Sequence, residues 1–101
     1  MIHELRTYRV FEHNRAAFLE RFLEEAAPRM RRYGFTIEHM WFADDAGPLF
    51  VYLLAWDDEN AMQAAWKRFM ADEEWIAVKK ETAERHGDLV ATVESRVLRT
   101  I

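Results

Sequence analysis

An uninterrupted apolar run spans residues 49–56 and reads Leu-Phe-Val-Tyr-Leu-Leu-Ala-Trp. A strand with one wet face alternates apolar and polar residues, whereas a continuous run is typical of a strand covered on both faces. A second aromatic-rich run, residues 35–42, precedes it, and the polar segment between the two contains Gly47 and Pro48. This pattern predicts a β-hairpin whose second strand is buried on both sides.

The register of this hairpin depends on the length of its loop. A four-residue loop over residues 44–47 places Ala43 opposite Pro48. The residues that then share one face are Phe35, Ile37, His39 and Trp41 with Trp56, Leu54, Tyr52 and Phe50. One residue more or less in the loop would reverse this partnership, because side chains alternate between faces.

A helical pattern precedes the hairpin. Asn14 is a candidate N-cap, and apolar residues then recur at helical spacing. They are Phe18, Leu19, Phe22, Leu23, Ala26, Ala27 and Met30. Pro28 lacks a backbone donor and predicts a kink in this helix, and Gly34 predicts its end.

Two shorter helices are predicted after the hairpin. The acidic segment 57–60 favours a helix start because carboxylates suit the positive end of the helix dipole, and Asp72 caps the next helix, which ends at Gly87. Strand-like segments occupy both ends of the chain, at residues 2–10 and 90–101.

The order strand, helix, strand, strand, helix pair, strand predicts one domain over residues 1–101 with a ferredoxin-like α+β fold (βαββαβ). Its four-stranded antiparallel sheet carries the helices on one face. Because the apolar strand at 49–56 needs cover on the other face too, a second copy is expected there. Two such sheets packed face to face form a dimeric α+β barrel, so the prediction is a homodimer through the sheet face.

Composition narrows the class of protein. Half of the 101 residues are hydrophobic and 14% are aromatic, which predicts a packed core. The net charge of −4 argues against a nucleic-acid partner, and no apolar span is long enough for membrane insertion. Without cysteine there is neither a disulfide nor a thiolate site. A cytoplasmic protein is the expectation.

The sequence resembles the NIPSNAP family, within the dimeric α+β barrel superfamily. The resemblance rests on segments 4–8 (Glu-Leu-Arg-Thr-Tyr), 33–35 (Tyr-Gly-Phe), Trp56 with its acidic successor, 72–75 (Asp-Glu-Glu-Trp) and 94–98 (Glu-Ser-Arg-Val-Leu). It spans essentially the whole chain and implies the homodimeric barrel. It implies no particular reaction, since related barrels include cofactor-independent monooxygenases, haem-degrading enzymes and small stress proteins.

His39 is the most interesting of the four histidines, because it lies within an apolar strand. It is either a hydrogen-bonded core residue or a catalytic base, and in the register above its cross-strand neighbour is Tyr52. The histidines form no pair at metal-ligand spacing, so no metal site is predicted, and no cofactor is implied.

Glu4, Arg6 and Tyr8 share a face of the first strand, either as a structural ion pair or as the polar part of a pocket. Four tryptophans could line a cavity or belong to core and interface packing. They are Trp41, Trp56, Trp66 and Trp75.

A ligand pocket is expected within each subunit, between the sheet and the helices, where related barrels commonly bind. Its predicted lining is Tyr8, His39, Tyr52 and Trp56, with Trp66 or Trp75 from the helices. Arg6 is the expected partner of a carboxylate or phenolate, because its guanidinium stays charged and offers a planar fork of donors.

Two functional hypotheses follow. In the first, the protein is a binding or interaction module that holds a small apolar or aromatic molecule. In the second, it is a cofactor-independent monooxygenase-like enzyme that acts on an aromatic or polyketide-like substrate, with His39 and Tyr52 as candidate catalytic residues. The first is placed ahead, because no recognisable catalytic set occurs in the sequence.

Overall fold

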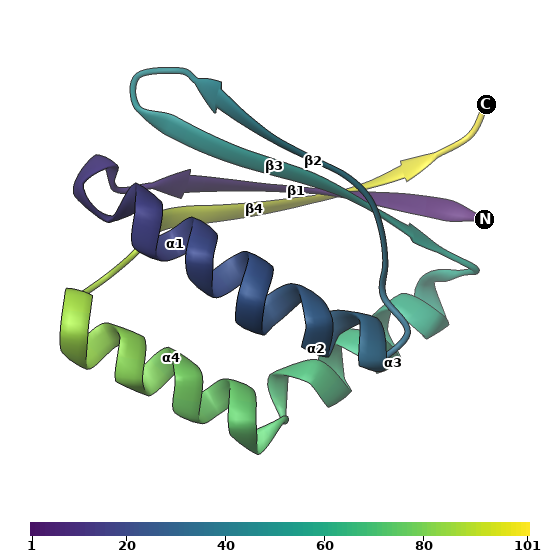
Figure 1. Cartoon of the computed structure of the whole chain (residues 1–101). Helices are drawn as coiled ribbons and strands as arrows, with labels where there is room; N and C mark the ends of the chain where they lie inside the picture. The colour runs from purple at the N-terminus through teal and green to yellow at the C-terminus, as the bar shows by residue number, and fades with distance from the viewer.

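A computed structural model describes all 101 residues (Figure 1). Strand β1 (Ile2–Val10) leads through a short 3₁₀ helix (Glu12–Asn14) into a long helix. That helix consists of α1 (Arg15–Arg21), a π-helical turn (Phe22–Ala26) and α2 (Ala27–Arg32). The elements that follow are β2 (Thr36–Asp44), β3 (Pro48–Trp56), α3 (Glu59–Met70), α4 (Glu73–His86) and β4 (Val90–Arg99).

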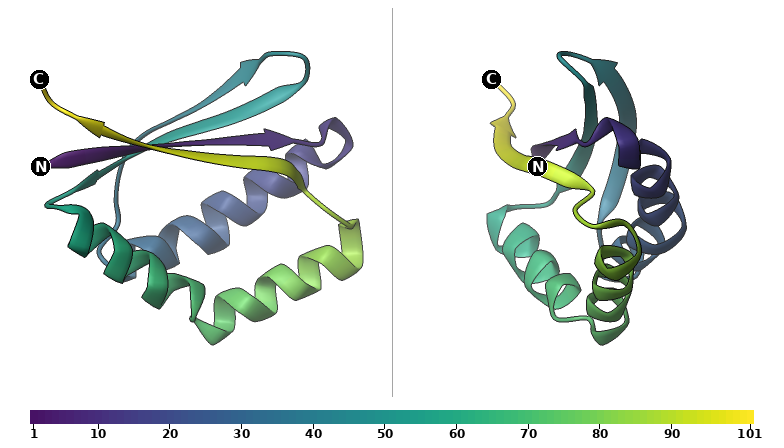
Figure 2. Two further views of the ribbon diagram at one scale, coloured as in Figure 1. Left: turned by 180° about the vertical axis from the view of Figure 1, so that it is seen from behind. Right: turned by 90° about the vertical axis from the view of Figure 1, so that its left-hand side faces the viewer.

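The four strands form one antiparallel sheet in the order β2-β3-β1-β4. All helices lie on one face of this sheet, and its other face carries no element (Figures 1 and 2). This is the predicted ferredoxin-like α+β fold. No helix in the structure is both long enough and apolar enough to cross a membrane.

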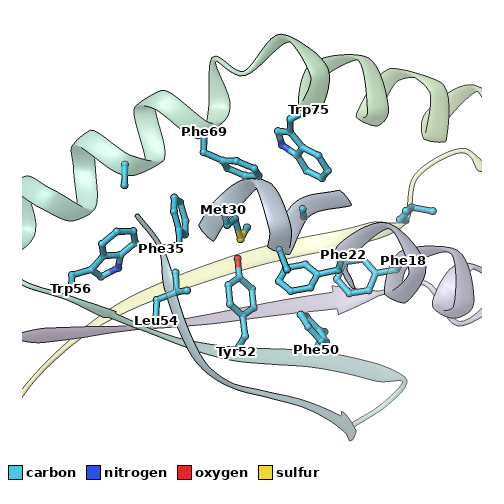
Figure 3. Close-up of a cluster of buried hydrophobic side chains, with 14 of the residues drawn as sticks. Phe18, Phe22, Met30, Phe35, Phe50, Tyr52, Leu54, Trp56, Phe69 and Trp75 are labelled. Atoms are coloured by element: carbon cyan, nitrogen blue, oxygen red, sulfur yellow. The ribbon is translucent and has the colours of Figure 1, made fainter. Parts of the chain in front are cut away.

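The core fills the space between the sheet and the helices. β3 contributes Phe50, Tyr52, Leu54 and Trp56 to it, all nearly inaccessible to solvent. Figure 3 shows these side chains facing Phe18 and Phe22 of the first helix and the aromatic side chains of α3 and α4. The apolar run in the sequence therefore does form a central strand, with alternate residues directed at the helices.

The predicted hairpin register is wrong in the half next to the loop. Asp44 pairs with Pro48, so the loop has three residues rather than four, and His39 lies opposite Leu53 instead of Tyr52. An irregularity at Glu38 shifts the register by one residue. On the side of Glu38 away from the loop, Ile37 pairs with Leu54 as predicted. A bulge of this kind adds one residue to one strand and exchanges the faces of everything beyond it.

The predicted ends of the helices are mostly confirmed. Gly34 adopts a φ of 92° after α2, while Asp58 and Asp72 each accept a hydrogen bond from the backbone N–H three residues on. Asn14 is the exception, because its side chain makes no capping bond. Its amide nitrogen donates instead to the carbonyl oxygens of His86 and Asp88, both at 2.9 Å, and so ties the end of α4 to the start of α1.

Candidate functional site

A cavity of about 240 Å³ lies between the sheet and the helices. The aromatic side chains that line it come from β1, the first helix, α3 and α4: Tyr8, Phe18, Phe22, Trp66, Phe69 and Trp75. Its only charged lining residues are Arg6, Arg21 and Lys79. Apolar walls with a few convergent polar groups are the usual composition of a small-molecule site.

Two other depressions have a different character. One, of about 330 Å³, lies beside the start of the chain and α3 and is lined mainly by small side chains such as Ala61, Ala64 and Ala65. The other is an outer groove of about 210 Å³ between α1 and α4, with mostly charged walls. Neither has the aromatic-rich lining of the cavity under the sheet, so that cavity is the candidate site.

Strand alternation on β1 directs Arg6 and Tyr8 into this cavity. Arg6 Nη2 donates to the Tyr8 hydroxyl at 3.2 Å, and the hydroxyls of Tyr8 and Tyr52 lie 2.6 Å apart. Tyr52 is fully buried, and the Tyr8 oxygen is the only acceptor within reach of its hydroxyl. Because a buried hydroxyl hydrogen needs an acceptor, Tyr52 donates and Tyr8 accepts. The hydrogen of Tyr8 is then free to donate to a molecule in the cavity.

Glu4 lies on the same face of β1 and is only 3% exposed. One of its carboxylate oxygens accepts the indole N–H of Trp56 at 3.1 Å and that of Trp66 at 2.8 Å. The other accepts the hydroxyl of Ser95 at 2.7 Å and lies 3.8 Å from Arg6 Nη1. Glu4 thus fixes the indole of Trp66, whose ring stacks 4.3 Å from the Arg6 guanidinium carbon.

Two of the three cations that line the cavity, Arg21 and Lys79, are held by an aromatic ring rather than by carboxylates. Arg21 and Lys79 form no salt bridge, and their charged groups lie 5.4 Å and 5.7 Å from the ring centre of Trp75. Burial lowers the pKa of Arg21 below its usual value. Burial also acts to lower the pKa of Arg6, but the Tyr8 and Tyr52 hydroxyls outweigh it and leave that pKa above the ordinary value. Burial raises the pKa of Tyr52 well above its usual value, so this phenol stays protonated.

The sequence model of the NIPSNAP family matches residues 3–101. The chain belongs to the NIPSNAP family. Among solved structures, an uncharacterized NIPSNAP domain protein from Burkholderia xenovorans superimposes on it with a TM-score of 0.82 at 24% identity, covering 100% of this chain and 95% of the other.

More distant structures share the same fold. A NIPSNAP family protein from Agrobacterium tumefaciens gives a TM-score of 0.82 at 18% identity. The match covers 99% of the present chain and 92% of the Agrobacterium chain. An antibiotic biosynthesis monooxygenase gives 0.63 at 10% identity, with coverage of 100% and 99%. At these identities the likeness concerns the fold alone. No curated protein matches the chain significantly.

The NIPSNAP fold brings most of the predicted site residues together. Arg6, Tyr8, Trp66 and Trp75 line the cavity itself. Tyr52 stands behind Tyr8 as its hydrogen-bond partner, and Trp56 stands beside Glu4 rather than at the cavity wall. Which of these residues contact a ligand stays a prediction.

His39 does not join this site. The register shift places it on the outer face of the sheet, where it is exposed and its ring stacks 5.4 Å from that of Trp41. The expected contact between His39 and Tyr52 is therefore wrong, and His39 does not belong to the core between the sheet and the helices.

Sequence reasoning missed the two cations that the helices bring to the cavity, Arg21 and Lys79. Both had a signal, because Arg21 follows the buried Phe18 by three positions and Lys79 follows Trp75 by four. Such spacings place two side chains on one face of a helix. Cations at the margin of an apolar stripe look like ordinary surface residues unless the tertiary structure closes over them.

Proposed function

We propose that this NIPSNAP protein binds a small apolar or aromatic molecule in the cavity beneath its sheet, and that it does so as a homodimer. The observation that carries the proposal is the cavity lining, in which eleven of fourteen residues are hydrophobic while Arg6 and Tyr8 present donors at one place. Aromatic walls supply affinity and the donors fix the orientation of the bound molecule.

The monooxygenase-like alternative has weaker support. The cavity could hold an aromatic substrate, and an antibiotic biosynthesis monooxygenase has the same fold. The base proposed for this chemistry, His39, lies on the opposite face of the sheet. Tyr52 does not replace it, because its raised pKa keeps it protonated. We therefore place ligand binding ahead of catalysis.

The outer face of the sheet supports the homodimer. Leu49, Val51 and Leu53 of β3 point away from the helices, and the neighbouring Trp41 is 49% exposed. Strand β4 is exposed along almost its whole length, and a long unprotected edge strand is a site for pairing with another chain. A second copy of this surface would cover both features.

The cytoplasmic location expected from the sequence stays a prediction.

The binding proposal can be tested by blocking the cavity. Val93 lines the cavity and is 52% exposed, so Val93→Trp adds a large ring there at little cost in stability. We expect one-ring probes such as benzoate and benzamide to shift the indole N–H resonances of Trp66 and Trp75 in the wild type. In the variant these shifts should require at least about tenfold more probe, equivalent to about 1.4 kcal/mol.

The matched control is Val97→Trp. Val97 lies on the same strand and the same face, four residues further along, but it does not line the cavity. Binding by this variant should equal that of the wild type. Equal loss in both variants would assign the effect to strand β4 in general, and no shift by either probe in the wild type would refute the binding proposal.

A further inference from the structure

The cavity has a charge opposite to that of the whole chain. The protein carries a net charge of −4, yet three cations and no Asp or Glu line this cavity. Side chains from three separate elements converge there: Arg6 from β1, Arg21 from α1 and Lys79 from α4. Low-dielectric walls focus such a field, so the cavity favours a negatively charged molecule.

Arg6 has bonding capacity that the protein does not use. Its side chain is 17% exposed, and its Nε is buried without a hydrogen-bond partner. Glu4 lies nearby, but at 3.8 Å from Nη1, and its oxygens already accept three hydrogen bonds. Guanidinium groups bind carboxylates through paired N–H donors, and the free hydrogen of Tyr8 adds another donor at the same place.

The volume limits the size of the ligand. An engineered apolar cavity of about 150 Å³ holds benzene, and pockets for drug-sized molecules occupy about 300–1,000 Å³. At about 240 Å³ the present cavity lies between these values. It has room for one aromatic ring with short substituents.

We infer that the ligand is a one-ring aromatic carboxylate whose carboxylate contacts Arg6 and Tyr8 while its ring packs among the aromatic side chains. This inference rests on the proposed function of the cavity and specifies its ligand class. Arg21 and Lys79 need not touch the carboxylate. They raise the affinity through the field that they create, so neutralising either one has a smaller effect than neutralising Arg6.

Benzoate and its neutral isostere benzamide distinguish charge from shape. In NMR titrations of the intact protein, followed at the Trp66 and Trp75 indole N–H resonances, we expect benzoate to bind at least about tenfold tighter than benzamide. Arg6→Met should abolish this preference. Arg21→Met and Lys79→Met should each weaken benzoate binding severalfold more than they weaken benzamide binding.

Lys80→Met is the matched control, because Lys80 is the exposed neighbour of Lys79 on α4 and does not line the cavity. It removes the same charge and should leave the benzoate preference intact. Equal affinity for both probes, or equal effects of Lys79→Met and Lys80→Met, would overturn the inference while the binding proposal stands. If neither probe binds, both fall. If Arg6→Met does not fold, the two helix variants still decide the outcome.

Discussion

Glu4 is a buried carboxylate whose closest partners are neutral donors. Two indole N–H groups and one hydroxyl bond to it, while the nearest cation lies 3.8 Å away. The carboxylate thus joins β1 to β3 through Trp56, to α3 through Trp66 and to β4 through Ser95. Its role is to position Trp66 against Arg6. The sequence suggested that Glu4 is one half of an ion pair, but in the structure it holds in place a side chain that lines the cavity.

Glu4→Ala should destabilise the fold severely. The substitution leaves two indole N–H groups and a hydroxyl without an acceptor, and each buried unsatisfied group costs about 1–3 kcal/mol. We expect the free energy of unfolding in urea, at one fixed protein concentration, to fall by about 3–5 kcal/mol.

Glu84→Ala on the exposed surface of α4 is the control for Glu4→Ala and should stay within about 0.5 kcal/mol of the wild type. Glu4→Gln should fall between the two variants, since its amide oxygen can still accept both indoles. A loss in Glu4→Ala no larger than in Glu84→Ala would contradict this role.

At the scale of elements, the first helix shows how one proline shapes the cavity. Pro28 cannot donate to the carbonyl of Glu24, and the helix accommodates it with the π-helical turn at Phe22–Ala26. The N–H of Ala27 donates to the carbonyl of Phe22, five residues back. This wider turn contains Phe22 and Ala26, which both line the cavity. The irregularity expected at Pro28 is therefore present, but as a π-helical turn, a form that sequence periodicity does not specify.

The junction between α3 and α4 should be sensitive to acid through Asp72. Its carboxylate caps α4 at Trp75 and accepts the hydroxyl of Tyr33 at 2.5 Å. The hydrogen bond from Tyr33, followed by that from the Trp75 backbone, lowers the pKa of Asp72 below its usual value. A carboxyl whose pKa is lower in the folded state stabilises the protein above its unfolded pKa, and this contribution is lost as the pH falls through the folded value.

Asp72→Asn tests this dependence, because asparagine keeps the cap but does not ionise. The variant should unfold at lower urea concentration than the wild type at pH 7, and the difference should shrink as the pH falls from 5 towards 2. Tyr33→Phe removes the hydrogen bond that contributes most to the lowered pKa of Asp72, so this variant should lose less stability than the wild type as the pH falls. A difference for Asp72→Asn that does not vary with pH would argue against the ionised carboxylate.

At the scale of the whole molecule, the fold was predictable because its signals extend over many residues. Three such signals are the apolar stripe of the first helix, the continuous run of β3 and the order of elements. Each of them is still recognised when a single residue is misassigned. The site was less predictable, because a face assignment depends on single residues. The bulge at Glu38 moved His39 out of the site, and nothing in an aromatic-rich strand indicates where a bulge will occur. The face of the sheet on which Arg6 and Tyr8 lie was predictable because β1 alternates without interruption up to Arg9.

We expect the outer face of the sheet to determine the oligomeric state of the protein. Val51 lies at the centre of that face, between Thr7 of β1 and Trp41 of β2. Val51→Lys places a charge where we propose that a second copy packs, and burying an unpaired charge is costly. Light scattering of the wild type at micromolar concentration should give twice the chain mass of 12.1 kDa. The variant should be insoluble or unfolded rather than a soluble monomer, because the exposed apolar strand then lacks cover.

Ala77→Lys, on the exposed surface of α4, adds the same charge away from the sheet and should leave the dimer intact. A wild type that is a stable monomer under these conditions would refute the homodimer, since its outer face would then be stable in water on its own.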